Sequence, residues 1–159
     1  MSGEDLIEKT LVLIKPDAVR RGLIGEIVSR FENAGLRLLA IKMADCTSQI
    51  LDKHFPIDDL DWIEGMGNRA LEGCKENQID ISEITDTYDP LSIGRRILKM
   101  NYDYMLSGPV VVMIWQGQHA IAQVRKMVGS TIPASALPGT IRGDYASSSS
   151  DYSISIGVA

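Results

Sequence analysis

The run GPVVVMIWQG, residues 108–117, constrains the fold more than any other part of this 159-residue chain. Its β-branched and aromatic residues favour a strand, and its apolar residues follow one another without polar alternation. Such a pattern is typical of a central strand that is buried on both faces. The run is far too short to cross a bilayer, so we expect a globular protein and no membrane association.

Two further strands and a helix are predicted in the first third of the chain. Residues 10–14 form a short apolar run that Pro16 ends, which predicts a buried strand with Lys15 at its end. From Gly22 the apolar residues recur at helical spacing up to Phe31, whereas Arg30 falls on the polar side. Residues 36–46 then have the partly alternating character of a second strand.

Helical patterns fill most of the middle of the chain. Thr47 or Ser48 is placed to cap a short helix toward His54, and residues 61–76 and 89–106 both show helical periodicity. We interpret residues 56–103 as a helical insertion. A last helix is predicted over 121–128, after the central strand.

This order of elements predicts the fold class. Strand, helix, strand, helices, strand and helix form two split halves, which favours an α/β (α+β) ferredoxin-like sandwich with an antiparallel sheet covered by helices. We expect residues 1–159 to form a single domain. The fourth strand should follow the loop 129–145, where YSISIGV is a weak candidate within a mobile tail, 146–159.

The charge of the chain restricts its partners. Its formal net charge is −5, and a field of that sign repels polyanions, so we expect no nucleic acid partner. Any phosphate must be held locally, which favours a small phosphorylated ligand. The beginning MSGEDLIEKT lacks the pattern of a signal peptide, and we expect a cytoplasmic protein.

Residues with phosphate-binding chemistry gather at predicted loops and element ends. The loop GSTIPASALPGTIRGDY, residues 129–145, contains Thr131, Arg142 and Asp144. Lys15 and Arg125 also lie at ends of elements. Lysine supplies a mobile charge, arginine a planar two-pronged donor and threonine a directed hydroxyl, the combination that a phosphoryl group needs.

Taken together and in their order along the chain, several stretches of this sequence resemble a known protein family. The chain is similar to the nucleoside diphosphate kinases over about residues 9–55 and 104–145. The similarity lies in TLVLIKPDAVRRGLIGEIVSRFENAGLRLLAIKM, then KHF, then YMLSGPVVVMIWQGQHAIAQVRKMVGSTIPASALPGTIRGDY. The combination of IKPD with PGTIRGD is the most specific part of the match.

The resemblance implies an activity and a set of site residues. It implies a homo-oligomer that transfers the terminal phosphoryl group of a nucleoside triphosphate to a nucleoside diphosphate, through a phosphohistidine and with magnesium held mainly by the nucleotide phosphates. Lys15 would contact the transferring group, and Arg125, Thr131 and Arg142 would hold the diphosphate. Phe55 stands where the family usually has a tyrosine near the base and sugar, and core packing is an equally good interpretation of it. No metal site of the protein's own is implied.

One element of the family pattern is not found in residues 1–159. The family's segment with the nucleophilic histidine is absent, and neither His54 nor His119 matches its position. We favour a longer chain whose histidine lies outside residues 1–159 over a truncated form. Two other hypotheses stay open: an inactive relative that binds nucleotides or builds an oligomer, and a ferredoxin-like regulatory domain for another small ligand.

Overall fold

The computed structural model describes residues 6–76, 80, 86–131 and 135–146. The chain divides into two compact units. The sheet unit comprises Met1–Asp45 and Ser107–Ala159, and the helical unit comprises Cys46–Leu106. The candidate fourth strand and the tail from residue 147 lie outside the described residues, and the single-domain organisation stays a prediction.

The sheet unit contains an antiparallel sheet of three described strands. These are β1 (Ile7–Ile14), β2 (Arg37–Ala44) and β3 (Val110–Gln118), in the order β1-β3-β2. Both outer strands pair antiparallel with β3, which confirms the predicted central position of this run. The register of β2 shifts between Leu38 and Ala40, where the strand bulges.

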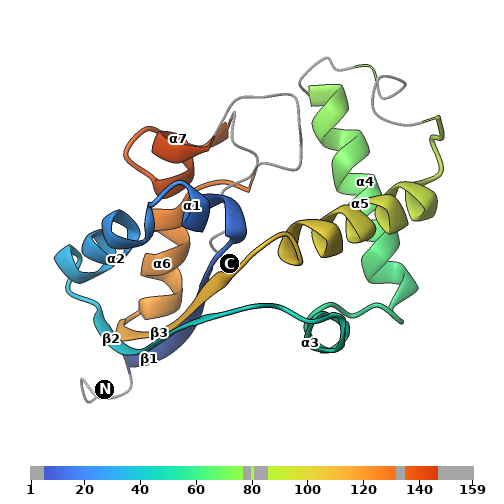
Figure 1. Ribbon diagram of the computed structural model, residues 1–159. Coiled ribbons are helices and arrows are strands. Elements are labelled where there is room, and N and C mark those ends of the chain that lie inside the picture. Colours follow the sequence, from blue (N-terminus) through green and yellow to red (C-terminus); the bar gives the residue numbers. More distant parts are fainter. Residues whose placement is uncertain (1–5, 77–79, 81–85, 132–134, 147–159) are drawn as a thin grey trace. The chain divides into compact units, whose positions relative to one another are not determined.

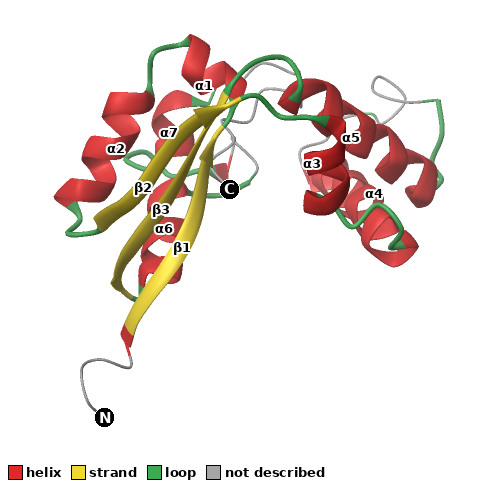
Figure 2. Cartoon of the chain, turned by 60° about the horizontal axis from the view of Figure 1, so that its bottom comes forward, coloured by secondary structure: helices red, strands yellow, loops and turns green. Residues whose placement is uncertain are grey.

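Four helices of the sheet unit lie on one face of this sheet (Figure 1, Figure 2). They are α1 (Pro16–Arg20), α2 (Ile24–Asn33), α6 (Ala120–Val128) and α7 (Ile141–Tyr145). The core between sheet and helices includes Phe31 and Trp115, both with no exposed surface, whose ring centroids are 5.2 Å apart. This arrangement confirms the ferredoxin-like α/β prediction.

The other face of the sheet corrects one expectation. Leu11 of β1 and Ile114 of β3 are directly opposite each other, so their side chains share a face. They are 51% and 38% exposed. The prediction that the central strand is buried on both faces is therefore wrong, because the described helices of this unit cover only the face of Val111, Met113 and Trp115.

Helix α1 was not predicted, although its first residue was noted. Pro16 was interpreted only as the end of a strand, but it occupies the first turn of α1, where its missing N–H costs nothing. The helix buries Ala18 completely in the core. Lys15 is the residue between β1 and α1, and it occupies the N-cap position of the helix without a side-chain capping hydrogen bond.

The helical unit contains α3 (Ser48–His54), α4 (Leu60–Glu76) and α5 (Pro90–Met105), drawn in teal, green and yellow in Figure 1. Thr47 caps α3 and Asp89 caps α5 through their side chains, as the sequence indicated. Helices α4 and α5 approach closely at two glycines. A Cβ atom at Gly67 would overlap the Pro90 backbone, and one at Gly94 would overlap the Ile63 carbonyl.

We searched the described helices for membrane spans. None of them combines the length and the apolar character that a crossing would require.

Candidate functional site

Lys15 is held at the junction between β1 and α1. Its side chain is half-buried, and Pro16, Asp17 and Ala18 that follow it are buried. Burial lowers the pKa of the Lys15 ammonium, the nearby Arg142 guanidinium lowers it further, and Asp17 acts in the opposite direction. The fold thus brings two cationic side chains of the predicted site close enough for each to affect the other's charge.

Arg142 lies in α7, a helix of five residues that begins after the cap Thr140. Its guanidinium Nη1 donates to the carbonyl oxygen of Gly129 at 2.9 Å. The side chain is half-buried, and burial lowers the pKa of Arg142. A partly desolvated guanidinium binds a charged acceptor more strongly than one in water does.

Gly129 closes α6 in a conformation that suits glycine. Its φ is +87°, and a Cβ atom there would lie 2.5 Å from Oγ1 of Thr140. The absence of a side chain lets the loop pack against the end of α6, and Thr140 in turn accepts from the Gly143 amide at 3.0 Å. This packing brings the segment of Arg142 to the helix that carries Arg125.

Arg125 and Thr131 flank this helix end. Arg125 lies in the last turn of α6 and is exposed. Thr131 is also exposed and follows Gly129 by two residues. The structure therefore places Lys15, Arg125, Thr131 and Arg142 in the sheet unit, with Arg142 in electrostatic contact with Lys15 and hydrogen-bonded to the end of α6.

Phe55 belongs to the helical unit, where it packs against other aromatic rings. Its ring centroid lies 5.5 Å from that of Tyr102 and 6.3 Å from that of Trp62, and His54 meets it edge-on at 4.8 Å. Phe55 is half-buried in this cluster. Its observed contacts are those of a packing residue.

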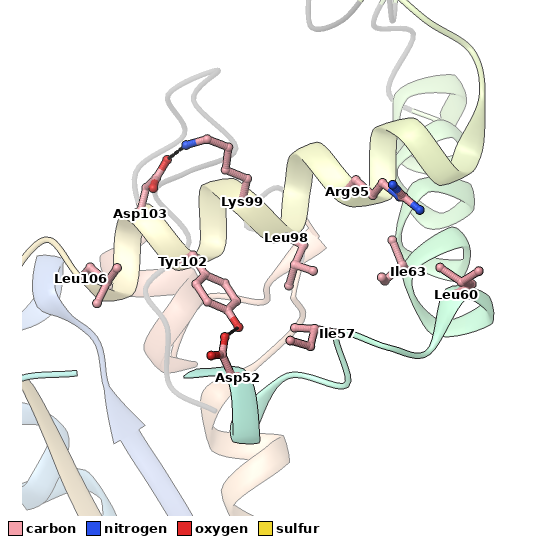
Figure 3. Close-up of a pocket in the computed structure, with 10 residues that line it drawn as sticks. All are labelled: Asp52, Ile57, Leu60, Ile63, Arg95, Leu98, Lys99, Tyr102, Asp103 and Leu106. Carbon is pink, nitrogen blue, oxygen red and sulfur yellow. Dashed lines mark hydrogen bonds and ion pairs between the residues drawn. The ribbon is translucent and has the colours of Figure 1, made fainter. Parts of the chain in front are cut away.

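A cavity of about 590 Å³ adjoins this cluster within the helical unit (Figure 3). Tyr102 points toward Asp52, and its hydroxyl donates to the carboxylate at 2.7 Å. Lys99 and Asp103 form an ion pair of 2.6 Å at the same cavity. Both carboxylates that line the cavity are thus already paired with side chains of α5.

His119 is far from Lys15. The His119 amide donates to the carbonyl of Leu6, before the start of β1, whereas Lys15 follows the end of that strand. An eight-residue strand spans roughly 25 Å, so the two side chains lie at opposite ends of the sheet. The sequence interpretation that His119 is not the nucleophile stays a prediction.

The sequence interpretation missed the contacts of Arg30. Arg30 pairs with Asp144 at 2.8 Å and with Glu26 at 3.1 Å, and it donates to the Tyr145 hydroxyl at 3.0 Å. The backbone amide of Gly139 also donates to Asp144, and together with Arg30 it lowers the pKa of that carboxyl. Asp144, noted in the sequence for its phosphate-site chemistry, therefore anchors the loop.

The chain matches a family model over most of its length. The model for nucleoside diphosphate kinase matches residues 8–59 and 62–154. A nucleoside diphosphate kinase of Pyrobaculum aerophilum is 46% identical over 145 residues, which cover 91% of this chain and 79% of that protein.

Solved structures agree with this match. The crystal structure of an NDP kinase from Pyrobaculum aerophilum superposes with a TM-score of 0.78 at 45% identity, covering 87% of this chain and 76% of that chain. A nucleoside-diphosphate kinase from Borrelia burgdorferi, a transition-state mimic with bound vanadate and ADP, has a TM-score of 0.68 at 34% identity. It covers 94% of this chain and 71% of its own.

Proposed function

Because the chain belongs to the nucleoside diphosphate kinase family, we propose that it transfers the terminal phosphoryl group of a nucleoside triphosphate to a nucleoside diphosphate. The family match covers both halves of the candidate site, the segment of Lys15 and the segment of Arg142. The proposal takes the kinase of Pyrobaculum aerophilum as its model for the reaction.

The pairing of Lys15 with Arg142 is the observation that carries the proposal. Burial and the nearby Arg142 guanidinium both lower the pKa of Lys15, so the two cations lie close enough to repel each other. An anionic phosphate between or beside them would relieve the repulsion. Such an anion would gain from both cations.

We assign roles to the side chains as follows. Lys15 contacts the transferring phosphoryl group, and Arg125, Thr131 and Arg142 hold the diphosphate. Phosphoryl transfer needs fixed positive charge opposite the equatorial oxygens, where negative charge spreads in the transition state. Phe55 would lie near the base and sugar, as the family resemblance implies.

Magnesium is part of the same proposal, as a component of the substrate. Mg²⁺ favours phosphate oxygens and water over cages built only of protein groups, so it would enter on the nucleotide. Across residues 6–76, 80, 86–131 and 135–146, no group of three or more His, Cys, Asp or Glu side chains is arranged to hold a metal ion.

The reaction would proceed in two balanced steps. A histidine nitrogen attacks the terminal phosphorus of the triphosphate and the diphosphate leaves, and a second nucleoside diphosphate then takes the phosphoryl group from the histidine. We assign this role to neither His54 nor His119. We also propose that the protein is a homo-oligomer, as the family resemblance implies, and that it acts in the cytoplasm.

Nucleotide binding and phosphoenzyme formation test the proposal. We expect Arg142→Ala to weaken ADP binding, measured by calorimetry with magnesium present, by roughly 10- to 100-fold, since a charge-assisted contact is lost. Lys126→Ala removes an exposed cation of α6 and should leave the affinity unchanged. Full-length protein should form an acid-labile phosphoenzyme with radiolabelled ATP. Nucleotide binding without any phosphoenzyme would favour the inactive relative.

A further inference from the structure

Arg30 of α2 connects this helix to the segment that carries Arg142. Its guanidinium Nη1 lies 2.8 Å from Oδ2 of Asp144, and its Nη2 donates to the Tyr145 hydroxyl at 3.0 Å. The guanidinium also lies over the Tyr145 ring, 4.8 Å from its centroid. Asp144 and Tyr145 are the two residues after Gly143, so these contacts fix the second half of α7.

The same pair of side chains holds the residue before α7. Arg30 donates to the Gly139 carbonyl at 3.3 Å, and Asp144 accepts from the Gly139 amide at 2.7 Å. Gly139 has a φ of +88° and precedes Thr140, the cap of α7. Both backbone polar groups of Gly139, its N–H and its C=O, are thus bound by the Arg30–Asp144 pair, and the start and the end of the short helix are fixed together.

Arg142 lies between these two fixed points. A helix of five residues has little stability of its own, because few backbone hydrogen bonds offset the entropy of ordering it. Its position must come from tertiary contacts. Ile141, completely buried in the core, and Arg21, which donates to the Tyr145 carbonyl at 2.7 Å, add to the contacts of Arg30.

We propose that Arg30 is a positioning residue for phosphate binding: through Asp144, Gly139 and Tyr145 it sets the orientation of α7 and hence of the Arg142 guanidinium. The inference rests on the proposed function, in which Arg142 contacts the diphosphate. Only 23% of the Arg30 side chain is exposed, and Glu26 occupies its Nε at 3.1 Å. Arg30 therefore acts through Arg142 and does not contact the nucleotide.

A double-mutant cycle tests this inference. Arg30→Ala, Arg142→Ala and the double variant are titrated with ADP in the presence of magnesium, and their thermal unfolding is recorded. We expect Arg30→Ala to weaken ADP binding roughly 10- to 100-fold in the wild-type background and less than about threefold when Arg142 is already alanine. A general structural role would produce equal losses in both backgrounds, and that result would overturn the inference.

Milder variants keep the test decisive if Arg30→Ala unfolds. Asp144→Asn retains an acceptor for the Gly139 amide but loses the ion pair with Arg30, and it should show the same dependence on Arg142. Arg30→Lys can keep the pairing with Asp144 but cannot also reach Gly139 and Tyr145, so it should recover part of the affinity. Arg37→Ala, which removes an exposed arginine at the start of β2, is the matched control.

The outcomes separate the two proposals. If Arg142→Ala leaves ADP affinity unchanged, the proposed site itself is wrong. If Arg142→Ala weakens binding but Arg30→Ala and Asp144→Asn do not, the site stands and the positioning role of Arg30 is wrong.

Discussion

Arg142 and Gly129 are joined by a hydrogen bond of 2.9 Å from the guanidinium to the backbone carbonyl. Gly129 ends α6, and its own amide donates to the carbonyl of Arg125 at 3.1 Å. A single residue therefore connects the two arginines that the sequence assigned to diphosphate binding. Because the loop returns to the helix at this point, Arg142 of α7 lies at the same end of α6 as Arg125.

Arg125→Ala should weaken nucleotide binding without destabilising the fold. The side chain is exposed, so its removal leaves no cavity, whereas the loss of a charge-assisted contact to phosphate costs about 1.5–3 kcal/mol of binding free energy. Calorimetric titration with ADP and thermal unfolding measure the two effects separately. An unchanged affinity, equal to that of Lys126→Ala, would remove Arg125 from the site.

Gly94→Ala should destabilise the helical unit. A Cβ atom at Gly94 would overlap the carbonyl of Ile63, so α4 and α5 would have to move apart, at a cost of about 1–3 kcal/mol. Gly65→Ala on α4 is the matched control, because a Cβ atom there meets only the end of the Arg69 side chain at 3.4 Å. Urea unfolding should show a loss for residue 94 and none for residue 65, and equal behaviour of the two variants would contradict the close helix contact.

Tyr102 should titrate unusually late. Burial and the hydrogen bond to Asp52 raise its pKa to about 12, whereas a tyrosine in the unfolded chain titrates near 10. Since the folded-state pKa is raised, the contribution of Tyr102 to stability is complete below about pH 10 and is lost as the pH rises toward 12. In an absorbance titration of the tyrosines, the variant Tyr102→Phe should lack the step near pH 12 that the wild type shows. If the step that disappears in Tyr102→Phe lies near pH 10 instead, the contact with Asp52 is contradicted.

Asp144 should contribute to stability only above mildly acidic pH. The amide of Gly139 and the ion pair with Arg30 lower its pKa, so the stabilisation is present above the unfolded value of about 4 and is lost as the pH falls through the lower folded value. The midpoint of thermal unfolding should fall more steeply for the wild type than for Asp144→Asn as the pH is lowered below about 4. Parallel declines would show that the carboxylate is not held as described.

Most elements of both units follow from local patterns in the sequence. The continuous apolar run predicted β3, helical spacing predicted α2 and α6, and the polar residues Thr47 and Asp89 marked two helix starts. These features depend on neighbours within a few residues, which one sequence contains. The exposure of Ile114 was missed because the cover of a sheet face depends on where distant helices pack.

The candidate site was predicted in part. The cationic residues could be identified from their residue types, loop positions and family resemblance. The contacts of Arg30 could not, because its partners Asp144 and Tyr145 are more than 100 residues away and an exposed (i, i+4) pair with Glu26 is an equally good explanation of an arginine on a helix. For Phe55 the sequence allowed two interpretations, a contact with the nucleotide or core packing. Only the fold showed the aromatic rings around it.

The most direct measurement of the central claim is the pKa of the Lys15 ammonium, followed by NMR of its side-chain nitrogen with and without ADP and magnesium. If Lys15 and Arg142 share one phosphate, the bound anion offsets the effects of burial and of the guanidinium, and the Lys15 pKa rises on binding. An unchanged Lys15 pKa at saturating ADP would contradict the account, since it would place the phosphates away from this pair of cations.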